Sequence, residues 1–96
     1  MSLSAHMEEI SCRIHGRVQM VMYRDFVQRK AHALALVGYV RNMPDSTVEV
    51  VAQGSRDSLE KLVANLRKGS LLARVSKVDV EWRTPKNRYE SFDIVF

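Results

Sequence analysis

Residues 16 to 24 are the part of this chain best suited to chemistry, because they combine a glycine, a short loop and an arginine at the expected start of a helix. The segment reads Gly-Arg-Val-Gln-Met-Val-Met-Tyr-Arg and lies between an alternating run and a helical pattern. Such a loop can direct several backbone N–H groups to one point, where the helix dipole adds partial positive charge. Arg24 falls in the first helical turn, where a cation loses roughly the 0.3–1 kcal/mol that an anion gains. An arginine placed against the dipole suggests an anion-binding site.

Other catalytic and metal-binding motifs are missing from the sequence. It contains no HExxH, no paired cysteines, no GxxxxGK[ST] and no nucleophile elbow. The sequence also contains His6, His15 and His32, none of which belongs to such a motif. Isolated histidines of this sort are more often exposed or structural than catalytic. We therefore expect neither a metal nor a cofactor.

Periodic patterns predict seven elements around this segment. Apolar residues alternate in a strand over 10–14 that ends at Gly16, and helical spacing follows from about residue 22 to about 36. Two β-rich runs, 39–42 and 47–52, indicate a hairpin. A second helix begins after a Ser55 cap and ends at Lys68 and Gly69. Alternation returns over 77–83 and 92–96.

This order predicts an α+β fold of the ferredoxin-like type, βαββαβ plus a short C-terminal strand, with two helices on one face of a mixed or antiparallel sheet. The handedness of crossover connections puts the first and third strands side by side at the sheet centre. The loop at 16–24 is then expected near the start of the hairpin. We expect residues 8–96 to form the single domain and residues 1–7 to be a tail or a cloning remnant.

Composition limits the class of protein. With 96 residues, 46% hydrophobic and 27% charged, the chain is an ordinary globular domain, and no apolar run approaches the roughly 18 residues of a membrane span. The net charge of +4 is spread along the chain, which permits steering of a small anion. Its one cysteine, Cys12, cannot form an internal disulfide. We expect a cytoplasmic monomer that acts on a small molecule, with no membrane partner.

Two strings in the sequence carry a family resemblance. GRVQMVMYR and the downstream GYVRNMPDSTVEVVAQG closely resemble the two signature segments of the acylphosphatase family. The resemblance implies that the phosphoryl group is held by the Arg24 guanidinium and by the backbone amides of six residues, Val18, Gln19, Met20, Val21, Met22 and Tyr23. It also implies that Asn42 orients the attacking water, and that an oxygen of the substrate's own phosphate helps to take the proton.

The residue types agree with hydrolysis of an acyl phosphate to a carboxylate and inorganic phosphate. An arginine, an asparagine and backbone amides include no general acid, so they cannot readily expel an alkoxide. A carboxylate, whose conjugate acid has a pKa of about 4, leaves without a proton or a metal. Phosphoryl transfer through a loose transition state depends mainly on positioning and charge stabilisation, which such a site supplies.

The chain departs from the family pattern at three positions. Family members usually have glycine at the position of Met20, and commonly at those of Ala35 and Ser46. If the loop needs a positive φ at Met20, the methionine is strained by roughly 1–2 kcal/mol or turns its amide away from the phosphate. Alternatively, the loop accommodates Met20 with its side chain outward. At Ala35 and Ser46 we expect effects on stability rather than on chemistry.

Two other functions are compatible with the sequence. A catalytically weakened relative would bind phosphate or an acyl phosphate without hydrolysing it, although retention of both Arg24 and Asn42 argues against this. A nucleic-acid-binding module of the same fold would stack bases on aromatic residues of its central strands. The runs at 10–14 and 48–53 contain no aromatic residue, which makes that function a poor match.

Overall fold

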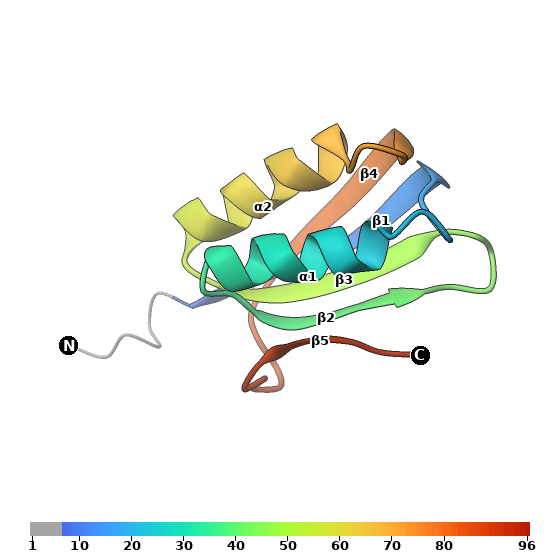
Figure 1. Ribbon diagram of the computed structural model, residues 1–96. Helices are drawn as coiled ribbons and strands as arrows, with labels where there is room; N and C mark the ends of the chain where they lie inside the picture. Colours follow the sequence, from blue (N-terminus) through green and yellow to red (C-terminus); the bar gives the residue numbers. More distant parts are fainter. Residues whose placement is uncertain (1–6) are drawn as a thin grey trace.

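The structure of the protein, a computed structural model, describes residues 7–96. Its elements are β1 (Glu8–Arg17), α1 (Tyr23–Ala33), β2 (Val37–Asn42), β3 (Val48–Gly54), α2 (Arg56–Lys68), β4 (Arg74–Arg83) and β5 (Phe92–Ile94). One sheet has the order β4-β1-β3-β2-β5, and only the β2–β5 pair is parallel. Both helices cover the same face of the sheet (Figure 1). The predicted ferredoxin-like fold, with the first and third strands adjacent at the centre, is confirmed.

The expected tail lies almost entirely outside the described residues. Residues 1–6 are not described, and Met7 directly precedes β1. Within residues 7–96, no helix has the length and apolar character needed to cross a bilayer.

The register of the three central strands determines what meets at one end of the sheet. Val48, the first residue of β3, pairs with Ile14 near the end of β1 and with Asn42 at the end of β2. The loop after β1 and the last residue of β2 therefore lie at the same end of the sheet. Figure 1 shows this end on the right, with the β1–α1 loop, the β2–β3 turn and the C-terminus together. The predicted position of the loop near the hairpin is confirmed.

Apolar side chains from the helix-covered face of the sheet form one core with both helices. Its fully buried members include Ile10, Cys12 and Ile14 of β1, Val48, Val50 and Ala52 of β3, Val27 and Ala31 of α1, and Leu59, Leu62 and Leu66 of α2. Burial raises the pKa of the Cys12 thiol to about 12, so this side chain stays protonated at neutral pH and packs as a small apolar group.

Local signals determine both ends of α2. The Ser55 hydroxyl accepts a hydrogen bond from the Ser58 N–H at 3.2 Å, which satisfies one donor of the first turn. Gly69 ends the helix with φ of 77° and donates its N–H to the Asn65 carbonyl. The predicted boundaries of this helix are confirmed.

The end of α1 differs from the prediction. The helix ends at Ala33 rather than near residue 36, because Ala35 adopts a left-handed φ of 57°. The Leu36 N–H then bonds to the Ala31 carbonyl at 2.9 Å and the Ala35 N–H to the His32 carbonyl at 3.1 Å, the two bonds of a Schellman motif. Glycine is the usual signal of such a helix end, so helical spacing alone, with alanine at this position, placed the end too late.

Gly38 lies within β2, shortly after the end of α1. Its φ is 140°, and a side chain there would place Cβ only 1.9 Å from the Val51 carbonyl oxygen. The glycine is therefore required by the close approach of β3, not by a helix end.

The β2–β3 connection is a three-residue loop of residues 44–46. The Met43 N–H donates to the Thr47 carbonyl at 2.8 Å, and Ser46 has a left-handed φ of 74°. Hairpins of this length usually have a left-handed third residue, for which glycine is preferred. Asp45 stabilises the loop by accepting from the N–H and the hydroxyl of Thr47, which lowers the pKa of its carboxyl group.

The strands differ in length from their predicted spans. β1 and β4 are longer, at ten residues each, and β4 forms one edge of the sheet with charged side chains at alternate positions on its outer face. β5 is shorter than the run at 92–96 and ends at Ile94.

Replacing Ala35 or Ser46 with glycine should stabilise the fold, because both residues are exposed and have a left-handed φ. We expect Ala35→Gly and Ser46→Gly each to raise the free energy of unfolding by about 0.5–1 kcal/mol, since the relief of left-handed strain exceeds the added freedom of the unfolded chain. Urea denaturation measures this change. The control Ala33→Gly, at an ordinary helical position, should lower stability, and a loss of stability in the first two variants would contradict the strain at these positions.

Candidate active site

The candidate site is the loop of residues 18–22 between β1 and α1. The pairing of β1 with β4 shifts register between His15 and Gly16, just before β1 ends at Arg17. Met20 and Met22 then have left-handed φ values of 60° and 59°. Turns that contain left-handed residues can direct successive N–H groups to one side of the backbone, an arrangement suited to binding an anion. Met22 is also the N-cap of α1 and offers no side-chain acceptor to the first-turn N–H groups, which remain available to an anion.

Buried side chains anchor this loop to the hydrophobic core. Val18, Val21 and Tyr23 lie in the core, whereas Met20 and Met22 point to solvent. The Tyr23 hydroxyl donates to the Leu66 carbonyl at 2.8 Å and thereby joins the start of α1 to the last turn of α2. Burial, with a smaller contribution from Cys12, raises the pKa of this hydroxyl well above its usual value, so it remains a donor.

The Gln19 side chain ties the loop to the hairpin. Its Nε2 donates to the Met43 carbonyl at 2.9 Å and to the Thr47 carbonyl at 2.8 Å, so one amide group spans the base of the β2–β3 turn. The sequence had suggested only a backbone role for Gln19. Nothing in its spacing indicates the side-chain contacts, because their partners are main-chain carbonyls more than twenty residues away.

Arg24 is half-buried in the first turn of α1. Its guanidinium carbon lies 4.9 Å from the centre of the Phe96 ring, a cation–π contact. Among residues 7–96, it has no carboxylate within ion-pair distance, in contrast to Arg29 on the same helix, which pairs with Asp25. Its donors are therefore available for an anion.

Asn42 is the last residue of β2, and its side chain contains a buried oxygen, Oδ1, without a hydrogen-bond partner among the described residues. An unsatisfied buried acceptor costs about 1–3 kcal/mol, so such groups are uncommon and often have a functional role. This oxygen can accept a hydrogen bond from a water molecule.

The C-terminal segment links Arg24 to the strand of Asn42. The Val95 N–H donates to the Val40 carbonyl at 2.9 Å, which continues the pairing of β5 with β2 toward the end that bears Asn42. Phe96 follows and stacks on Arg24. The sequence had assigned Phe96 to a strand, and its contact with Arg24 was missed because the short β5 could not be aligned against β2 from pattern alone.

The Arg24 guanidinium and the N-terminus of α1 both bring positive charge to this end of the sheet, which suits an anion. The residues 7–96 contain no cluster of three histidine, cysteine or acidic side chains able to hold a metal ion. A larger hollow of about 660 Å³ lies at the opposite end of the sheet, between Trp82 and Arg88. There Arg83 is already bound to the buried Glu9, so its charge is neutralised.

Comparison with known proteins identifies the family of this chain. The acylphosphatase family model matches residues 10–94. The chain belongs to the acylphosphatase family. An acylphosphatase from Thermus thermophilus is 47% identical over 76 residues, which cover 79% of this chain and 86% of that protein. The family resemblance seen in the two signature segments is therefore confirmed, and the protein is an enzyme that hydrolyses acyl phosphates.

Solved acylphosphatase structures have the same fold. The acylphosphatase from Coxiella burnetii superimposes with a TM-score of 0.92 at 34% identity and covers 99% of both chains. The Bacillus subtilis acylphosphatase gives a TM-score of 0.90 at 31% identity, over 93% of this chain and 99% of that one. The alignment over nearly the full length includes the loop and the hairpin.

We expect the two hydrogen bonds of the Gln19 side chain to hold the loop of residues 18–22 in place. We expect Gln19→Met to lower the free energy of unfolding by about 1–2 kcal/mol, because the Met43 and Thr47 carbonyls each lose one of their two donors. The variant should also weaken the inhibition of acetyl phosphate hydrolysis by inorganic phosphate. Gln19→Glu should be worse, because a carboxylate would face two carbonyl oxygens.

Gln28→Met is the matched control. The Gln28 amide also donates to a carbonyl, that of Phe92 at 3.1 Å, but away from the loop. The Gln28→Met variant should lower the free energy of unfolding without changing the inhibition constant of phosphate. Equal effects of the Gln19 and Gln28 variants on phosphate inhibition would show that Gln19 does not position the loop.

Proposed function

We propose that this acylphosphatase hydrolyses its substrate without a metal, using the loop amides, Arg24 and Asn42. In this proposal the phosphoryl oxygens accept hydrogen bonds from the backbone N–H groups of residues 18–23. Arg24 donates two parallel hydrogen bonds to the same group. The buried, unpartnered Oδ1 of Asn42, at the same end of the sheet as the loop, is the observation that carries the proposal.

The reaction itself needs little from the protein beyond positioning and charge. A water molecule held by Asn42 attacks phosphorus, and its oxygen forms a new P–O bond as the bond to the acyl oxygen breaks. The carboxylate leaves with the bonding electron pair and needs no proton. The water's proton passes to a phosphoryl oxygen of the substrate, so no side chain has to act as a base. Amides and Arg24 stabilise the charge on the equatorial oxygens.

A non-catalytic phosphate binder is the alternative within the same family. Its support is Met20, which replaces the glycine usual in the family. Met20 keeps the left-handed φ and directs its side chain to solvent, so the loop can retain its shape with a strained residue. The unpartnered Asn42 oxygen favours the enzyme, since a site that only binds phosphate does not need to hold a water.

We also propose that the protein acts as a monomer in the cytoplasm. The support is its single cysteine, Cys12, which is a buried free thiol and has no role as a cross-link.

Kinetics of benzoyl phosphate hydrolysis test the assigned roles. In the presence of a chelator we expect undiminished activity in the unmodified protein. Arg24→Ala should lower kcat/KM by at least about 10²–10³, the loss typical of one transition-state donor, and Arg24→Lys should recover only part of it. Asn42→Ala should lower kcat by about 10²–10³ while leaving the inhibition constant of phosphate within about threefold. Loss of activity on chelation, or a fully active Asn42→Ala protein, would refute the mechanism.

Strain at Met20 should be visible in turnover. We expect Met20→Gly to raise the free energy of unfolding by about 1 kcal/mol and to raise kcat for acetyl phosphate, by no more than the tenfold that about 1.4 kcal/mol allows. The control is Ala35→Gly, which relieves the same φ outside the site and should leave kcat unchanged. A stabilised Met20→Gly protein with unaltered kcat would show that this strain does not affect catalysis.

A further inference from the structure

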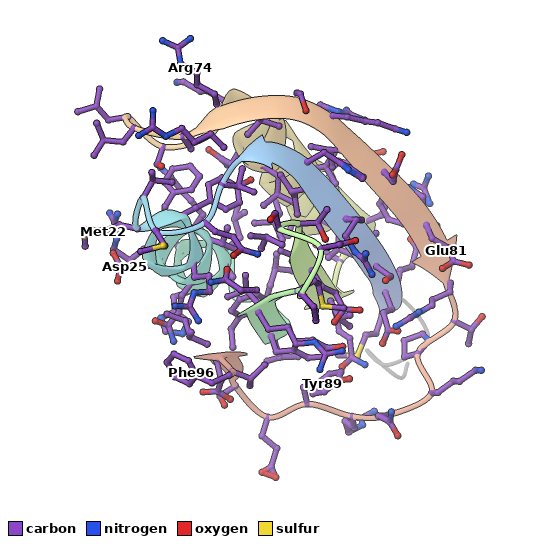
Figure 2. All side chains as sticks on the ribbon, turned by 90° about the vertical axis from the view of Figure 1, so that its right-hand side faces the viewer. Met22, Asp25, Arg74, Glu81, Tyr89 and Phe96 are labelled. Atoms are coloured by element: carbon purple, nitrogen blue, oxygen red, sulfur yellow. The ribbon has the colours of Figure 1, made fainter. Side chains whose placement is uncertain are left out.

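A cleft of about 430 Å³ opens beside Arg24. The loop contributes Val18, Met20 and Met22 to its wall, and the C-terminal segment contributes Ile94 and Phe96. Apart from Arg24, Asp25 is the one charged residue that lines it. Figure 2 shows Met22, Asp25 and Phe96 on the same side of the molecule. The cleft is thus an apolar extension of the proposed phosphate site.

The apolar side chains around this cleft are unusually exposed. Met20, Met22 and Phe96 are 98%, 73% and 99% exposed. Large apolar side chains gathered at the mouth of a site, rather than scattered over the surface, indicate contact with an apolar ligand group. Methionine suits this use because its flexible thioether adapts to groups of different shape.

The face and the edges of the Arg24 guanidinium have different surroundings. A guanidinium donates hydrogen bonds along its edges, whereas its face stacks on aromatic rings. Phe96 covers the face at 4.9 Å, so the edges remain for the phosphoryl group. An acyl group attached to that phosphoryl group can then extend into the cleft, beside the Phe96 ring and the two methionines.

We infer that this cleft binds the acyl half of the substrate and selects acyl phosphates whose acyl group is apolar and uncharged. This inference rests on the proposed function and adds a substrate class to it. The apolar walls of the cleft would desolvate a carboxylate on the acyl group without offering it a hydrogen-bond donor, which disfavours a charged acyl group. Hexanoyl and benzoyl phosphates should be preferred over acetyl and succinyl phosphates.

The test compares kcat/KM for acetyl, butanoyl, hexanoyl, benzoyl and succinyl phosphates. Full burial of a methylene group is worth about fourfold in affinity, and an open cleft should give about half of that effect, or roughly twofold per methylene. Hexanoyl phosphate should therefore exceed acetyl phosphate by at least about tenfold. Butanoyl phosphate should exceed succinyl phosphate, which has a chain of the same length.

Two variants connect this preference to the cleft. Met22→Asn removes an apolar wall and keeps a residue that tolerates a left-handed φ, and Phe96→Ala removes the ring. Each should reduce the hexanoyl-to-acetyl ratio by at least about threefold, the effect of losing part of the apolar contact. A shift of Arg24 would affect both substrates alike and so cancels in the ratio. Leu71→Asn, which changes an exposed apolar residue outside the cleft, is the matched control and should keep the ratio of the unmodified protein.

The outcomes separate this inference from the proposed function. Equal kcat/KM for acetyl and hexanoyl phosphates in an active enzyme would overturn the acyl subsite and leave the hydrolytic mechanism in place. A preference for hexanoyl phosphate that persists in both cleft variants would overturn the cleft as its source. Failure to hydrolyse any of the five acyl phosphates would overturn both.

Discussion

Pairing of Val48 with Ile14 on one side and Asn42 on the other is the constraint on which the site depends. The hydrogen-bonded register of three neighbouring strands leaves little freedom, because a slip of one residue would turn every core side chain to the wrong face. It holds the end of β1 and the end of β2 at the same end of the sheet, one on each side of the start of β3. The loop after β1 and the asparagine therefore lie at one end of the sheet by strand pairing alone, and Gln19 adds hydrogen bonds from the loop to the hairpin.

The elements that the sequence predicted well have their signals close by in the chain. Ser55 and Gly69 mark the ends of α2 because a cap acts on the adjacent turn, and alternation identifies β1 because its two faces differ in burial. The end of α1 was misplaced because an alanine occupies a left-handed position. Phe96 and the Gln19 side chain were missed because their partners are distant in sequence. Such contacts depend on strand register, which periodicity does not specify.

Among residues 7–96, four non-glycine residues have left-handed φ values, and they have different consequences although their local strain is similar. Ala35 and Ser46 end a helix and a hairpin, where any residue that accepts this conformation preserves the fold. Met20 and Met22 lie where the backbone itself is proposed to bind the ligand, so their side chains remain available for another purpose. Strain in a binding loop and exposed apolar surface, each unfavourable alone, coincide in these two methionines. A role in contacting a ligand therefore explains these two methionines better than a role in the fold does.

The two edges of the sheet also bear on the behaviour of the protein at high concentration. An edge strand exposes unpaired N–H and C=O groups that can pair with another copy of the chain and start aggregation. β5 limits this hazard by its length of three residues, whereas β4 is ten residues long. β4 instead presents charged side chains such as Lys77, Asp79 and Glu81 beside its free edge, and an approaching strand would have to desolvate them. Resistance to intermolecular sheet growth is thus built into each edge by a different physical means.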